Sequence, residues 1–148
     1  MAGVKAVAQT GEIATGTSAK TLLQLIAATN QRVKIKEFSV SFKGTSNTAA
    51  PIKVALVRQT DAGTMSALSP VKMNEADDET LQTTAQHTAT AEPTGSTEVM
   101  GEEVHPQSGY TWQAPFGGEI VVKGGNRLGL VVTAGADVNA KARFVFEE

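Results

Sequence analysis

The stretch EIVVKGGNRLGLVVTAGADVNAKARFVFEE, residues 119–148, decides the fold class. Near its end, apolar and polar side chains alternate, and only Val145 departs from the pattern. The apolar set is Val138, Ala140, Ala142, Phe144 and Phe146, and the polar set is Asn139, Lys141, Arg143 and Glu147. A period of two is typical of an antiparallel strand with one buried face. One strand earlier, Leu128, Leu130 and Val132 alternate in the same way, so the stretch predicts a β-protein.

Glycines inside this stretch predict its turns. Lys123-Gly-Gly-Asn-Arg127 separates two apolar runs. Gly and Asn accept the positive φ angles that a tight hairpin turn requires. We therefore interpret residues 119–148 as three strands joined by two tight turns, with a hairpin at residues 123–127.

Working towards the N-terminus, further strands are predicted from the same periodicity. Residues 21–27 are too short for a helix and lead straight into a Thr-Asn-Gln turn, which favours a strand. In residues 32–43 the apolar parity changes at Lys36 and Glu37, as one inserted residue would cause, and this predicts a β-bulge. Turn-forming residues 44–51 predict a loop, and a strand follows from Ile52.

Residues 80–91 alternate without a slip and predict a long strand. Small or apolar residues, namely Leu81, Thr83, Ala85, His87, Ala89 and Ala91, form the predicted inward face. Uncharged polar residues form the other face: Thr80, Gln82, Thr84, Gln86, Thr88 and Thr90. Burying such a face avoids the desolvation cost that Lys or Glu would carry. We expect Thr80, Gln82, Thr84, Gln86 and Thr88 to lie near subunit contacts.

The whole chain is predicted to be all-β. Its 148 residues suit a single antiparallel β-sandwich or jelly roll of about eight strands, covering residues 21–148. Residues 1–20 are rich in Gly and Thr and predict an extended N-terminal arm. Val4, Val7 and Ile13 are spaced along it as separate apolar anchors, so we expect the arm to lie on a partner.

Composition excludes several classes of function. The chain has no cysteine, which excludes a disulfide framework and a thiol nucleophile. Its net charge is -2 and its basic residues are scattered, so no nucleic-acid partner is expected. The N-terminus lacks an apolar run long enough for a signal peptide or a membrane span, so neither export by a recognisable leader nor a membrane partner is expected.

Candidate chemical sites are few, and the sequence favours a protein without enzymatic activity or cofactor. His87 and His105 are the only histidines, and neither has a second ligand at metal spacing, so a cupin-type metal site at His87 is the less favoured reading. Asp77, Asp78 and Glu79 are more typical of a solvated loop than of a Ca²⁺ site. Tyr110 and Trp112 share a face of a short strand bracketed by prolines, which predicts a place near a sheet edge. Core packing is their first interpretation, followed by a subunit interface and a sugar-stacking site.

Three stretches resemble small jelly-roll virion proteins of tailed bacteriophages. They are TLLQLIAATNQRVKIKEFSVSFKGTSN at residues 21–47, PIKVALVRQTDAGT at 51–64 and WQAPFGGEIVVKGGNRLGLVVTAG at 112–135. The resemblance implies a homotrimer that is made in the host cytoplasm and decorates the capsid surface as a cement protein. Its implied partners are other copies of itself and the major capsid protein. A carbohydrate- or receptor-binding module of a tail or baseplate is the alternative.

Overall fold

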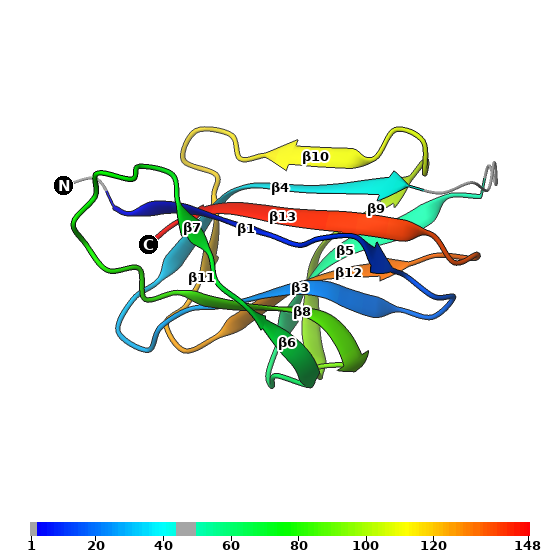
Figure 1. Cartoon of the computed structure of the whole chain (residues 1–148), viewed down its shortest axis with the longest axis horizontal. Helices are drawn as coiled ribbons and strands as arrows, with labels where there is room; N and C mark the ends of the chain where they lie inside the picture. Colours follow the sequence, from blue (N-terminus) through cyan, green and yellow to red (C-terminus); the bar gives the residue numbers. More distant parts are fainter. Residues whose placement is uncertain (1–2, 44–49) are drawn as a thin grey trace.

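The computed structural model describes residues 3–43 and 50–148, so residues 44–49 of the predicted loop at 44–51 lie outside it. The described residues form two antiparallel sheets packed face to face, and none of them is helical (Figure 1). The predicted all-β sandwich is therefore confirmed. No part of these ranges forms a helix of the length and apolarity needed to cross a membrane.

The seven strands of sheet A follow the order β10-β4-β13-β1-β7, with β11 also paired to β4 and β2 to β13. Their bounds are β1 Lys5–Gln9, β2 Ile13–Ala14, β4 Val33–Lys43, β7 Val71–Lys72, β10 Tyr110–Gln113, β11 Ile120–Val122 and β13 Asn139–Glu147. Sheet B has the order β6-β8-β3-β12-β5-β9. Its strands are β3 Lys20–Ile26, β5 Ile52–Gln59, β6 Thr64–Leu68, β8 Thr84–Ala91, β9 Gly95–Val104 and β12 Arg127–Thr133.

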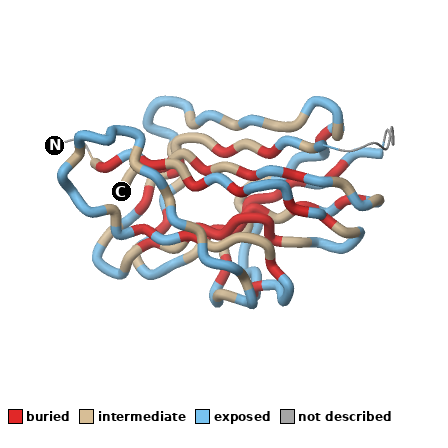
Figure 2. The backbone as a smooth tube through the Cα atoms, in the orientation of Figure 1, coloured by how far each residue is buried: buried red, intermediate tan, exposed pale blue. Residues whose placement is uncertain are grey.

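Buried residues gather between the two sheets (Figure 2). Phe144 and Phe146 of β13 are fully buried, as the alternation of this strand predicts, and Lys141 is exposed. Leu128 and Leu130 of β12 in sheet B belong to the same core cluster. The core is therefore the layer of alternating side chains that the two sheets share.

The β-bulge predicted at Lys36 and Glu37 is confirmed. Glu37 pairs with Val145 and Ile35 pairs with Phe146, which leaves Lys36 as the inserted residue of β4. The opposite edge of β4 changes partner at the same point, from β10 to β11. Between them, the amide of Ala114 donates to the carbonyl of Lys36 at 2.8 Å. The bulge thus fixes where the β10–β11 connection leaves the sheet.

The hairpin predicted at residues 123–127 is wrong, although the turn itself is present. Asn126 donates its amide to the carbonyl of Lys123 at 2.9 Å. However, β11 pairs with β4 in sheet A, whereas β12 pairs with β3 and β5 in sheet B. The turn crosses between the sheets and docks through the amide of Gly125 on the carbonyls of Ala27 and Ala28. Turn residues specify a reversal of the chain but not the partner of each flanking strand.

The structure corrects the predicted N-terminal arm. Strand β1 pairs along its whole length with β13, and β7 pairs with its other edge. Ala6 and Ala8 are completely buried, and Val4 and Ile13 are almost completely buried. Val7 is half-buried on the outer face of the sheet. The arm was predicted because its apolar density is low, but alanine suffices where a strand packs closely. Residues 3–14 are therefore part of the sandwich rather than an arm lying on a partner.

Candidate interaction surfaces

The polar strand face predicted from residues 80–91 is interrupted in the structure. Strand β8 begins at Thr84, because the carboxylate of Glu148 binds the preceding residues. It accepts the amides of Gln82 and Thr83 at 2.9 and 2.8 Å, and the Thr83 hydroxyl at 2.6 Å. Thr80, Gln82 and Thr84 are exposed, but Gln86 and Thr88 are half-buried. The role of these five residues in subunit contacts stays a prediction.

Thr88 also breaks the alternation of β8. Its φ angle is +57°, a left-handed conformation that β-branched residues rarely adopt. Across this point, the neighbouring β6 pairs Ser66 with His87 and Thr64 with Ala91, so β8 carries extra residues. The uninterrupted alternation predicted for residues 80–91 is therefore wrong from Thr88 onwards.

Tyr110 and Trp112 pack inward at the edge of sheet A. Both rings lie against Phe38, with centroid distances of 5.8 Å for Tyr110 and 5.6 Å for Trp112. Burial raises the pKa of Tyr110, and the charge of Glu102 on β9 adds to the shift. The first interpretation of the pair, as residues packed against the core, is confirmed. Their role in an interface or in sugar stacking stays a prediction.

No group of His, Asp and Glu suited to a metal ion occurs among residues 3–43 and 50–148. His87 is half-buried in β8, and its Nδ1 lies 2.9 Å from the Thr88 hydroxyl. His105 is exposed, and its Nδ1 accepts the amide of Gln107 at 3.1 Å. Asp77 accepts from the side chain of Asn74 at 3.0 Å, which is a contact within an exposed loop. Each of these side chains has a local structural contact.

A fully exposed aromatic ring lies in the connection between β10 and β11. Phe116 has an exposed fraction of 108%, the highest of the exposed large apolar residues described. It occupies the second position of a tight turn, in which Gly118 donates its amide to the carbonyl of Pro115 at 2.8 Å. Gly117 takes a φ angle of +76°, so the turn is of type II. This geometry points the phenyl ring away from the sandwich.

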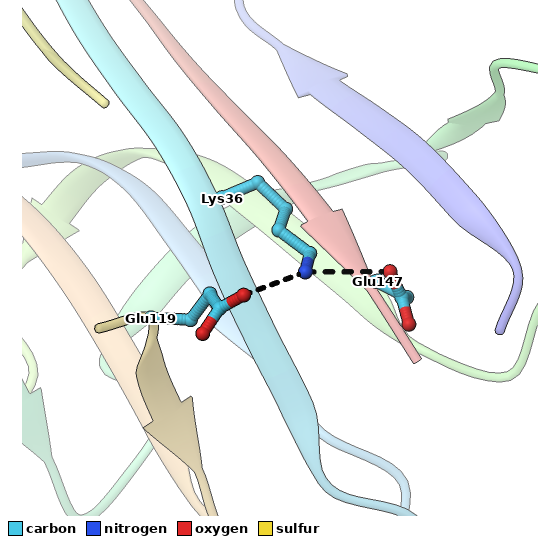
Figure 3. Close-up of polar contacts among 3 residues, drawn as sticks. All are labelled: Lys36, Glu119 and Glu147. Carbon is cyan, nitrogen blue, oxygen red and sulfur yellow. Dashed lines mark hydrogen bonds and ion pairs between the residues drawn. The ribbon is translucent and has the colours of Figure 1, made fainter. Parts of the chain in front are cut away.

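A group of three charged side chains fixes the base of this turn (Figure 3). Lys36 Nζ lies 2.9 Å from Glu119 Oε1 and 3.5 Å from Glu147 Oε2. The hydrogen bond with Lys36 lowers the pKa of Glu119, and the same bond raises the pKa of Lys36. The group joins the β10–β11 connection to β4 and β13, so the turn is held at both of its ends.

At the other edge of sheet A, an open concavity has a volume of about 610 Å³. It lies between the start of β1 and the β7–β8 connection. Its apolar lining comes from Val4, Met73 and Ala76, and its acidic lining comes from Asp77, Asp78 and Glu79. Met73 is 59% exposed, which is unusual for a large apolar side chain. The concavity therefore combines an apolar surface with an acidic rim.

The sequence identifies Gly117 and Gly118 as turn glycines, and the structure confirms the turn, but the exposure of Phe116 was missed although a signal was present. Pro-Phe-Gly-Gly at residues 115–118 has the glycine that a type II turn needs at its third position. A large apolar residue at the second position of such a turn is directed towards solvent. The concavity had no local signal, because its walls come from the start of β1 and from the β7–β8 connection, which are far apart in the chain.

Comparison of the chain with protein-family models, with curated proteins and with solved structures finds no match.

Proposed function

We propose that this protein is a non-enzymatic structural component of a tailed-bacteriophage virion, of the capsid decoration type. In this proposal it trimerises, binds the major capsid protein on the outer surface of the shell and strengthens contacts between neighbouring capsid subunits. The observation that carries the proposal is Phe116, an aromatic ring exposed on a turn that is fixed at both ends. Rigid, exposed aromatic residues are typical anchors of protein–protein contacts.

The resemblance to phage jelly-roll proteins supports the same role. Its three stretches supply β4 and β11 of sheet A and β3, β5 and β12 of sheet B, so they contribute to both sheets of the sandwich. The third stretch, residues 112–135, also contains Phe116 itself. The resemblance therefore covers both the framework and the proposed contact residue.

The outer face of sheet A suits a role in binding another protein. Val145, Val7 and Val71 lie side by side in one row across β13, β1 and β7, as their pairing shows. Lys5, Lys141 and Arg143 surround this row on the same face. A small apolar centre with charged surroundings is the arrangement typical of transient protein contacts.

Particle composition tests the proposal. Virions of the phage that encodes this chain would be purified and their proteins quantified by mass spectrometry, with cryo-EM to locate the protein. We expect many copies on the head, in a fixed ratio to the major capsid protein. Absence from purified particles would refute the proposal, and density confined to the tail would favour the receptor-binding alternative.

A further inference from the structure

We propose that copies of this chain join by inserting Phe116 of one copy into the concavity lined by Val4, Met73 and Ala76 of the next. Three such contacts close the homotrimer. This inference rests on the proposed function, in which the protein assembles with itself, and it names the surfaces that do so.

The first argument is that the projecting ring is held in place before binding. The turn hydrogen bond between Gly118 and Pro115, the bond from Ala114 to Lys36 and the ion pair of Glu119 all restrict the connection. A contact that is ordered in advance loses less conformational freedom on association. Because Phe116 has no packing of its own to lose, burying it on a partner is favourable.

The second argument is that the concavity has space and apolar surface for a phenyl ring. Its volume of about 610 Å³ exceeds that of one aromatic side chain. Met73 is the residue best suited to shape itself around an inserted ring, since its side chain is unbranched and its sulfur contacts aromatic rings favourably. Ala76 is exposed and small, so it leaves the entrance open.

The third argument is charge. Lys34 on β4 pairs with Val121 of β11. After the hydrogen bond from Lys36, the charge of Lys34 also contributes to the lowered pKa of Glu119, so its ammonium group lies near the base of the Phe116 turn. Asp77, Asp78 and Glu79 line the concavity together with a single basic residue, Lys5. Docking the turn into the concavity brings Lys34 towards this mainly acidic lining, which favours this partner over one of like charge.

The fourth argument is the arrangement of the two surfaces. The Phe116 turn follows β10 and precedes β11 on one edge of sheet A, and the concavity lies beyond β1 and β7 on the other edge. Four strand spacings, roughly 19 Å, separate these edges. A surface on one edge that fits a different surface on the opposite edge gives a head-to-tail contact, and such contacts form a ring when the rotation between successive copies closes, as the proposed trimer requires.

Sedimentation equilibrium provides the first test. We expect the wild-type protein to form a trimer at micromolar concentration and Phe116→Ala to raise its dissociation constant by about 30-fold or more. Thr133→Ala, on an exposed residue of sheet B, is the control and should assemble like wild type. Urea denaturation should show that Phe116→Ala folds normally, because the ring is exposed. A monomeric wild type, or unaltered assembly of Phe116→Ala, would overturn the inference.

A second test uses the lack of native cysteines. Pro115→Cys keeps Phe116, and Ala76→Cys lies in the concavity of the next copy. Mild oxidation of a mixture of these two single variants should give a covalent heterodimer in high yield. Thr133→Cys mixed with Ala76→Cys should not. Equal yields from the two mixtures would contradict the proposed contact.

These outcomes separate the inference from the proposed function. If the protein is present on phage heads but assembles independently of Phe116, the inference fails and the function stands. If Phe116 holds a trimer that is absent from phage particles, the function fails and the inference stands.

Discussion

Gly129 of β12 lies directly against the carboxamide of Gln59 on the neighbouring strand β5. A β-carbon on Gly129 would overlap Gln59 Oε1 and the rest of its carboxamide. Gln59 cannot move aside without loss, because its carboxamide accepts from Gln24 Nε2 at 2.8 Å and donates to the Thr21 hydroxyl at 3.0 Å. All three polar side chains are buried.

We therefore predict that Gly129→Ala destabilises the protein by about 2–4 kcal/mol, through overpacking and loss of buried hydrogen bonds. The matched control is Gly135→Ala, where no atom lies within 4 Å of the added carbon. Urea denaturation of both variants measures the difference. Adding Gln59→Ala to Gly129→Ala should recover part of the stability, and a purely additive loss would contradict the steric explanation.

Removing residues 1–9 should destroy or severely weaken the fold. The deletion removes the buried Val4 together with β1, which carries the buried Ala6 and Ala8 and pairs with both β13 and β7. We expect a loss of several kcal/mol from the ~5–15 kcal/mol typical of a domain. Thermal and urea unfolding measure it, with Lys5→Ala as a control on an exposed residue of the same strand. An unchanged melting temperature would restore the predicted arm that lies on a partner.

The contribution of Lys36 to stability should depend on pH. The folded protein lowers the pKa of Glu119, so the stability gained from this carboxylate is present at neutral pH and is lost as the pH falls through its folded pKa. The folded protein also raises the pKa of Lys36, so the stability gained from this ammonium group is lost at strongly alkaline pH. We expect the difference in stability between wild type and Lys36→Met to shrink below about pH 4.

Urea denaturation at pH 7 and pH 3 measures this difference, and high salt should reduce it at pH 7. Lys141→Met replaces another lysine of the same face of sheet A and serves as the control. A difference for Lys36→Met that does not vary with pH would show that packing of the side chain, rather than its charge, is responsible.

Replacing Thr88 by asparagine should stabilise the protein. The left-handed conformation at φ +57° costs a β-branched residue roughly 1–2 kcal/mol, and asparagine tolerates it better. We expect a gain of about 0.5–1 kcal/mol in the free energy of unfolding. Thr90→Asn, on an exposed residue of the same strand, should give no gain. Destabilisation by Thr88→Asn would mean that the contact of its hydroxyl with His87 outweighs the relief of strain.

Local patterns in the sequence predict the strands in which apolar and polar residues alternate clearly, but they did not predict β6 and β7. The faces of β13 follow from alternation alone, and the bulge at Lys36 follows from the change of parity in β4. Both features depend on residues that are neighbours in the chain. The edge position of β10 follows similarly from the prolines on either side of it.

Pairing between distant segments could not be predicted in this way. Nothing near residues 123–127 indicates that β11 and β12 belong to different sheets. The start of β8 depends on Glu148, which is 65 residues away from Thr83. The two candidate contact surfaces illustrate this difference. The Pro-Phe-Gly-Gly turn can be recognised from adjacent residues, whereas the concavity beside Met73 is formed by segments far apart in the sequence.

The pairing of β1 with β13 has a consequence for how the protein is made. Val4 and Glu148 exchange backbone hydrogen bonds of 3.1 and 3.0 Å, so strands from the two ends of the sequence are neighbours in sheet A. During translation β1 leaves the ribosome well before β13 and has no β13 to pair with until residues 139–147 have been synthesised. Sheet A therefore cannot complete before β13 emerges, and folding should be slow because most contacts are distant in sequence. Until then, the unpaired edges of the early strands are open to aggregation.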